Sequence, residues 1–201
     1  MKDLHPEQAS ILNNKFAYTY LIFDCDVHHP RMHDDRDIKQ IVFDNLIKIG
    51  ELLNYFNDET DPSKGKLYIN YPMMESYRDA NEFFDVQYKD AVVSINDIVN
   101  YKALVGKKKL SNKRVDSFTK EELCKLSLMN IFKLNYIVND LWGALSYNEY
   151  QKIMDTLRLY EAEKKKIDVE NKISVINTTL FLILDYYGNQ NGFYDSIMTE
   201  Q

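Results

Sequence analysis

The hydrophobic pattern of the first third of the chain predicts a strand, a helix and a second strand. Residues 16–24 form a nearly continuous apolar and aromatic run, which is typical of a strand buried on both faces of a parallel sheet. Acidic residues then precede a segment, 38–56, whose apolar positions lie three and four apart and predict an amphipathic helix. Residues 66–72 are the second strand candidate. This order predicts a parallel βαβ unit with a right-handed crossover.

The middle of the chain follows the helical period rather than the alternation of a strand. Residues 79–105 carry a weak helical pattern, which predicts one long helix. Thr119 with Glu122, and Ser146 with Glu149, have the spacing of capping boxes and mark the starts of two further helices. The low counts of glycine and proline, 6 and 4, favour long helices over a turn-rich all-β fold.

The last strongly apolar segment, residues 168–187, predicts a final helix that Gly188 is placed to end. We therefore expect an α/β fold, with a small parallel sheet in residues 1–78 and a large helical portion, residues 79–201, packed on it. Two parallel strands do not make a stable sheet. Further strands must come from a weakly marked segment, from a partner chain or from sequence outside this chain.

Composition indicates a compartment and excludes some partners. Two cysteines, Cys25 and Cys124, give neither a disulfide framework nor a zinc pattern, which favours a reducing cytoplasm. The first residues lack the apolar core of a signal peptide, and the apolar run 179–184 is too short to cross a bilayer. We expect a cytoplasmic protein without a membrane partner. The net charge of −6 argues against a non-specific coat for nucleic acid, although a local basic patch could still bind it.

Two carboxylates, Asp24 and Asp26, follow the first predicted strand and are the strongest candidates for chemistry. Ligands of an open α/β sheet bind outside the carboxyl ends of its strands. Two carboxylates at close range repel each other, and a divalent cation relieves that repulsion. Hard oxygen ligands suit Mg²⁺ or Mn²⁺. The alternative is that both residues only cap a loop.

Three histidines, His28, His29 and His33, lie in the loop that follows. A cluster of histidines invites a transition-metal hypothesis, but this spacing matches no zinc signature. Histidines exposed on a loop are the alternative interpretation. One of them, for example His28, could still act as a general base or contact a phosphate of a substrate.

The residues after the second predicted strand should lie beside Asp24 and Asp26, because parallel strands end at the same edge of a sheet. Glu75 is a candidate third metal ligand at this edge. Arg78 could hold a phosphate through two parallel hydrogen bonds. The alternative places Glu75 and Arg78 in the first turn of a surface helix, as a solvated pair.

A basic loop begins after residue 106 and could meet a phosphate backbone, which makes nucleic acid a candidate partner. Basic loops are also common on solvated surfaces, and that is the alternative interpretation. The cations of this loop are Lys107, Lys108, Lys109, Lys113 and Arg114.

Two short motifs resemble a known family. Residues 21–26 read Leu-Ile-Phe-Asp-Cys-Asp, and residues 70–75 read Asn-Tyr-Pro-Met-Met-Glu. Together they resemble the TOPRIM-like proteins of bacterial abortive infection and phage resistance, such as RloB-type and OLD-family nucleases. The resemblance implies a parallel sheet surrounded by helices, whose Asp-x-Asp strand end binds Mg²⁺ for cleaving or rejoining phosphodiesters. It makes Asp24 and Asp26 metal ligands and Glu75 the downstream acidic residue.

One part of the family pattern is missing from this sequence. The family has a glutamate on an earlier strand that is followed by a helix, whereas only 23 residues precede Asp24 and Glu7 lies in a helical or loop context. Three interpretations follow: an amino-terminally shortened member of the family, a replaced glutamate, or an incomplete catalytic site.

Three functions remain open. The first is a metal-dependent, nuclease-like module in phage defence that hydrolyses nucleic-acid phosphodiesters. The second is a non-catalytic partner or sensor subunit of a defence complex, assembled with a second copy or another protein; the missing glutamate and the 15 tyrosines favour it. The third is a haloacid-dehalogenase-type phosphatase with Asp24 as nucleophile and Asp26 as acid and base. That family expects Thr or Val where His28 stands.

Overall fold

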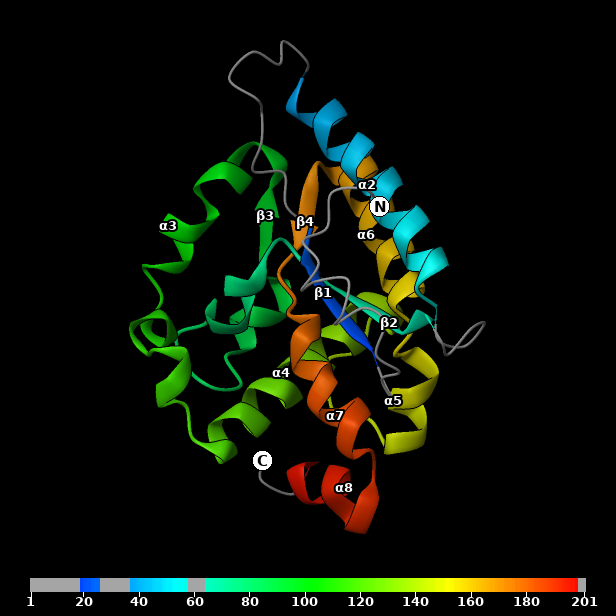
Figure 1. Cartoon of the computed structure of the whole chain (residues 1–201). Coiled ribbons are helices and arrows are strands. Elements are labelled where there is room, and N and C mark those ends of the chain that lie inside the picture. The colour runs from blue at the N-terminus through cyan, green and yellow to red at the C-terminus, as the bar shows by residue number, and fades with distance from the viewer. Residues whose placement is uncertain (1–18, 26–36, 58–63, 199–201) are drawn as a thin grey trace, which may run out of the picture.

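Residues 19–25, 37–57 and 64–198 are described by a computed structural model of the protein. Helices dominate this part of the chain, and its strands form two separate two-stranded sheets (Figure 1). The fold is therefore of the mixed α/β class with much helix, as the sequence predicts, while the division at residue 78 stays a prediction. None of the helices in the described ranges is both long and apolar enough to cross a membrane.

The first sheet is the predicted parallel pair. β1 (Tyr20–Asp24) and β2 (Lys66–Asn70) pair in parallel, and the helix α2 (Ile38–Tyr55) lies between them in sequence. The register places Asp24 opposite Asn70, so the two strands end at the same edge. The prediction of a strand, a helix and a second strand is thus confirmed.

α2 packs on α6 (Thr156–Glu170) along the apolar face that its sequence predicts, and the two helices run side by side (Figure 1). Gly50 allows the close approach, because a Cβ atom there would lie only 2.5 Å from the hydroxyl of Tyr160. Each fully buried aliphatic side chain contributes roughly 1.5–3 kcal/mol. The buried apolar residues of α2 are Ile41, Val42, Leu46, Ile49 and Leu53.

β1 is not buried on both faces, and that part of the prediction is wrong. The adjacent residues Ile22 and Phe23 are 39% and 48% exposed, and successive side chains of a strand point to opposite faces. β1 has one strand neighbour among the described residues, so it lies at the edge of a very small sheet. The apolar run signals a strand correctly, but β2 is the strand that is buried.

Residues 79–105 do not form the predicted long helix. They contain two 3₁₀ helices, η3 (Val86–Asp90) and η4 (Ile95–Asn100), the strand β3 (Val92–Ser94) and the short helix α3 (Tyr101–Val105). The helical pattern in this segment is weak, and the valine pair at 92 and 93 is β-branched, which suits a strand.

The predicted final helix over 168–187 is also wrong. α6 ends at Glu170, and Asn171 adopts a left-handed conformation with φ of 54°, which stops a helix. β4 (Lys172–Ser174) follows and pairs antiparallel with β3. Only α7 (Phe181–Tyr187) continues the predicted helix, and Gly188, with φ of 56°, ends it as expected.

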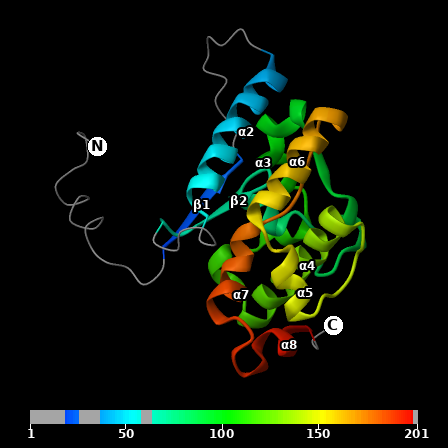
Figure 2. The same cartoon turned by 90° about the vertical axis from the view of Figure 1, so that its right-hand side faces the viewer.

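Both predicted capping boxes are present. The side chains of Thr119 and Glu122 open α4 (Lys120–Asn139), and those of Ser146 and Glu149 open α5 (Tyr147–Ile153). Figure 2 shows the last helix at the opposite end of the molecule from the start of α2. The remaining short helices are η2 (Met74–Arg78), η5 (Lys109–Asn112), η6 (Val115–Ser117), η7 (Thr178–Leu180), η8 (Gln190–Gly192) and α8 (Phe193–Met198).

The core contains many tyrosines. α4 supplies a continuous buried stretch, from Leu126 to Asn135, around which the other helices pack. A buried tyrosine adds a large apolar ring together with a hydroxyl that must find a partner. Six tyrosines are among the largest fully buried side chains: Tyr68, Tyr71, Tyr88, Tyr101, Tyr150 and Tyr194.

Candidate functional site

The carboxyl ends of β1 and β2 form the edge at which the sequence predicts a site. Asp24 ends β1 and is half-buried, and its register partner Asn70 ends β2 and is fully buried. The N–H of Cys25 donates to the carbonyl oxygen of Asn70 at 2.9 Å, which extends the pairing one residue beyond the strands. The backbone therefore fixes Asp24 at the place where α/β sheets bind ligands.

The carboxamide of Asn70 has one allowed orientation. Both the N–H and the hydroxyl of Thr179 donate to Oδ1 of Asn70, at 3.2 and 3.0 Å, so this atom must be the acceptor. The amide nitrogen then faces Asp24 and donates to its Oδ1 at 3.3 Å. Thr179 lies 155 residues after Asp24 in the sequence, and it helps to orient the carboxylate of Asp24 through Asn70.

The sequence gives no prediction for this role of residues 177–179. They fall inside the apolar segment that predicts a helix, and the structure instead lays them across the end of β2. The hydroxyl of Thr178 donates to the carbonyl oxygen of Ile69 at 2.9 Å. The side-chain amide of Asn177 donates to the carbonyl oxygen of Met74 at 2.8 Å. The run Asn-Thr-Thr, which is polar in an apolar context, is the signal that could have marked them.

Glu75 follows β2 as predicted, but its carboxylate has another partner. It lies in η2 and forms an ion pair with Lys102 of α3 at 3.3 Å. Asp26, His28, His29 and His33 lie outside the described residues. Across the ranges that the structure describes, no three His, Cys, Asp or Glu side chains lie close enough to hold a metal ion. Of the implied ligands, Asp24 alone is placed at the strand edge, and its hard oxygens suit Mg²⁺ or Mn²⁺.

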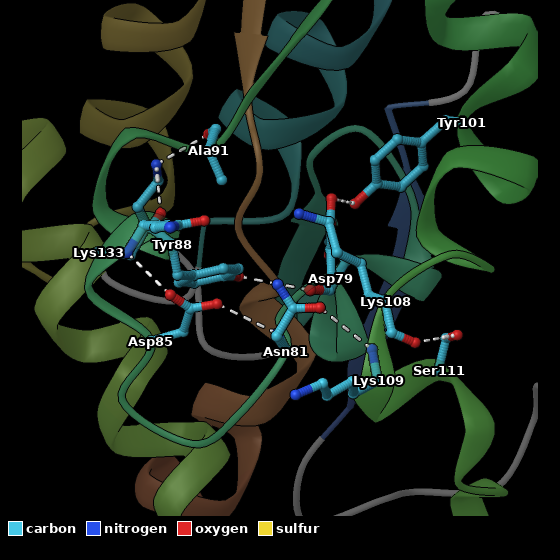
Figure 3. A network of polar contacts seen from close by, with 12 residues as sticks. Asp79, Asn81, Asp85, Tyr88, Ala91, Tyr101, Lys108, Lys109, Ser111 and Lys133 are labelled. Atoms are coloured by element: carbon cyan, nitrogen blue, oxygen red, sulfur yellow. Dashed lines mark hydrogen bonds and ion pairs between the residues drawn. The ribbon is translucent and has the colours of Figure 1, made fainter.

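Three of the five cations of the basic loop have acidic partners, and Figure 3 shows Lys108 and Lys109 of this loop. Lys108 pairs with Asp79 at 3.6 Å, and the backbone N–H of Lys109 donates to the side chain of Asn81 at 3.4 Å. Arg78 donates to the carbonyl oxygen of Ser111 at 3.3 Å. Lys113 and Arg114 pair with Glu122 and Asp116, whereas the side chains of Lys107 and Lys109 are exposed and make no ion pair with another described residue.

Asp79 is the buried carboxylate with which Lys108 of the loop pairs. It is buried, and the hydroxyl of Tyr101 donates to its carboxylate at 2.9 Å (Figure 3). Burial raises the pKa of Asp79, and the bond from Tyr101 and the charge of Lys108 act in the opposite direction. The ammonium group of Lys108 therefore compensates a buried carboxylate, which makes it a structural group in this arrangement.

Lys133, in the middle of α4, has only 1% of its surface exposed. Its ammonium group donates to the carbonyl oxygens of Tyr88, Lys89 and Ala91, at 3.1, 2.6 and 2.9 Å (Figure 3). Burial lowers the pKa of Lys133 to about 7, whereas the carbonyl dipoles favour its charged form. Lys133 thereby fastens the segment of η3 and β3 to α4.

Glu163, on α6, holds the partner strand of the same small sheet. It is fully buried, and its Oε2 accepts the backbone N–H of Ser174 in β4 at 2.7 Å. Its other oxygen, Oε1, has no hydrogen-bond partner among the described residues. Burial raises the pKa of Glu163, and the groups of Ser174 oppose that shift. Lys133 on α4 therefore binds the segment that leads into β3, and Glu163 on α6 binds β4.

Comparisons with protein-family models, with curated proteins and with solved structures find no match to this chain.

Proposed function

We propose that this chain is a metal-dependent, nuclease-like module of phage defence that hydrolyses phosphodiesters of nucleic acid. The observation that supports this function best is the placement of Asp24. Its carboxylate lies at the carboxyl end of a parallel strand pair, beside a buried amide that orients one of its oxygens. The defence context comes from the resemblance of residues 21–26 and 70–75 to TOPRIM-like proteins.

In this proposal Asp24 and Asp26 hold Mg²⁺ or Mn²⁺. The metal, when bound, polarises a phosphate oxygen and lowers the pKa of a water molecule. Asn70 orients Asp24 through the bond at 3.3 Å, and Thr179 keeps the amide of Asn70 in place. Glu75 can join the ligand set only after it leaves Lys102, so we propose for it an assisting role that requires a movement of η2.

The proposed contacts with substrate phosphates come from the side chains that keep exposed charge. Lys107 and Lys109 are exposed, and an exposed ammonium group gains most from a phosphate because it loses no internal partner. Arg78 and Lys108 have partners in the fold, at Ser111 and Asp79, and would bind a phosphate only by exchanging them. His28 stays a candidate contact outside the described residues.

The test is a titration of Mg²⁺ and Mn²⁺ by calorimetry, together with cleavage of a mixed panel of DNA and RNA. In Asp24→Ala/Asp26→Ala, metal affinity and metal-dependent cleavage should both fall roughly tenfold or more, because the metal loses its carboxylates. Asp97→Ala, which removes an exposed carboxylate from η4, is the matched control and should keep both. Absence of metal binding by the unaltered protein would contradict the proposal.

A second candidate, a non-catalytic partner subunit, is favoured by the exposure of β1. Ile22 and Phe23 leave apolar surface on both faces of an edge strand, and such surface is typical of an interface with another chain. Metal binding without cleavage by the isolated chain would favour this function over the first. Phosphorylation of Asp24 would instead indicate the phosphatase.

A further inference from the structure

A pocket of about 500 Å³ opens between the second half of α4, α6 and the β3–β4 pair, and it shares no residue with the edge around Asp24. Its volume lies within the range that holds small organic ligands, roughly 300–1,000 Å³. One face of α4 lines it with Lys133, Tyr136 and Ile137, and Asp140 lines it just after the helix ends. One face of α6 lines the other side with Ala162, Lys166 and Glu170. These spacings of three and four put each set on a single side of its helix.

The acidic residues of this pocket are more exposed than most of its lysines. Its acidic residues, Asp90, Asp140 and Glu170, are all exposed. Among its lysines, Lys133 is buried, Lys89 and Lys166 are half-buried, and Lys172 is exposed. An exposed carboxylate can turn toward water, but a half-buried ammonium group is less free to do so. The interior is therefore more positive than the rim.

The half-buried lysines make no direct ion pair with a described carboxylate, although the charge of Lys166 acts on the buried Glu163 one turn earlier on α6. Neither Lys89 nor Lys166 makes an ion pair with another described residue, although Asp90 and Glu170 are near in sequence. Asp90 instead accepts the hydroxyl of Tyr136 at 3.2 Å, and the ammonium group of Lys89 lies 4.6 Å from the centre of the Tyr136 ring. Lys89 and Lys166 are thus half-buried cations without a direct ion pair among the described residues, and an anionic ligand in this confined pocket would stabilise them.

A purely structural explanation covers only part of this arrangement. Lys166 and Lys172 lie near the carboxyl end of α6, where cations offset the helix dipole. Lys89 comes from η3, a separate element, and converges on the same space. Lys133 adds a fourth cation beneath, and the nearby charge of Lys166 contributes to the lowering of its pKa. Burial is the largest cause of that shift, and an anion in the pocket would counteract the contribution of Lys166.

We propose that this pocket binds a phosphorylated small molecule of mononucleotide size. Lys89 and Lys166 would contact its phosphate, and the ring of Tyr136 with the apolar wall of Val92 and Ile137 would contact its base. This pocket shares no residue with the site proposed for the nuclease function.

The experiment titrates AMP, inorganic phosphate and adenosine into the full chain by calorimetry at roughly physiological salt. AMP should bind most tightly, phosphate more weakly, and adenosine weakest. Lys166→Glu should weaken AMP binding by about tenfold or more, since it replaces a phosphate contact with a like charge. Lys165→Glu, one residue away on α6 but exposed and outside the pocket lining, should bind AMP as the unaltered protein does.

Thermal unfolding of each variant shows whether it folds, and Lys89→Gln repeats the test on a different element if Lys166→Glu unfolds. No binding of AMP or phosphate up to about 1 mM would overturn the proposal. Equal losses in Lys166→Glu and Lys165→Glu would overturn it too, because they would show a general effect of charge. Asp24→Ala/Asp26→Ala should bind AMP normally, so failure here is distinguishable from failure of the metal site.

Discussion

Replacing Lys133 with methionine is expected to lower the free energy of unfolding by about 2–4 kcal/mol. The methionine fills a similar volume but cannot donate a hydrogen bond. The carbonyl oxygens of Tyr88, Lys89 and Ala91 then lose a charged donor, and that of Lys89 has no other hydrogen-bond partner within the described ranges. Urea denaturation followed by circular dichroism gives the free energy directly.

The matched control is Lys125→Met, on the same helix. Lys125 pairs with Glu121 one turn earlier, an arrangement that contributes roughly 0.3–0.5 kcal/mol on a helix surface. A loss below about 1 kcal/mol in Lys133→Met would contradict the assigned role, since a bond to a charged group is usually stronger than that.

The lowered pKa of Lys133 predicts how the difference in stability between the unaltered protein and Lys133→Met changes with pH. Between about 7 and the ordinary value of 10.5, the unfolded chain holds the proton of Lys133 more firmly than the folded chain. Stability of the unaltered protein should therefore rise with pH across this window, relative to Lys133→Met. A constant difference between the two would show that the carbonyl oxygens keep Lys133 fully charged.

Local signals in the sequence predict the elements that local physics decides. α2 has a long apolar stripe, and Thr119 and Ser146 have the capping partners that open α4 and α5. β3 and β4 escape prediction because each has three residues, too few to show a period of two. Their existence depends on pairing with a strand about 80 residues away, which no local window contains.

Some residues of the candidate site can be predicted from the local sequence, and others cannot. Asp24 is predictable because it ends an apolar strand, whereas Asn70 lies inside the second predicted strand, 66–72, and the sequence assigns it no role in orienting Asp24. Thr179 is not predictable, since its bond to Asn70 spans 109 residues. Lys133 and Glu163 look like ordinary charged positions of amphipathic helices, and only the packing of β3 and β4 shows that both are buried.

Replacing Glu163 with glutamine is expected to raise the free energy of unfolding at neutral pH by about 1 kcal/mol or more, because burial of an ionised carboxylate costs more than burial of a neutral amide. Glutamine can still accept the N–H of Ser174, but it has no charge to desolvate at the position of the unpartnered Oε1.

The sign of the pH dependence distinguishes this explanation from a simple gain in packing. Because burial raises the pKa of Glu163, the folded chain holds its proton more firmly than the unfolded chain. Stability of the unaltered protein should therefore fall as pH rises from the ordinary carboxyl pKa through the raised one, and Glu163→Gln should lack that fall. Urea denaturation at several values between about pH 4 and pH 8 measures it, with the exposed Glu161→Gln as control. If Glu163→Gln is instead less stable at neutral pH, the ionised carboxylate has a partner that stabilises it. The charges of Lys166 and Lys133 both act on Glu163, that of Lys166 more strongly, so Lys166 is the first group to test by a double-mutant cycle and Lys133 the second.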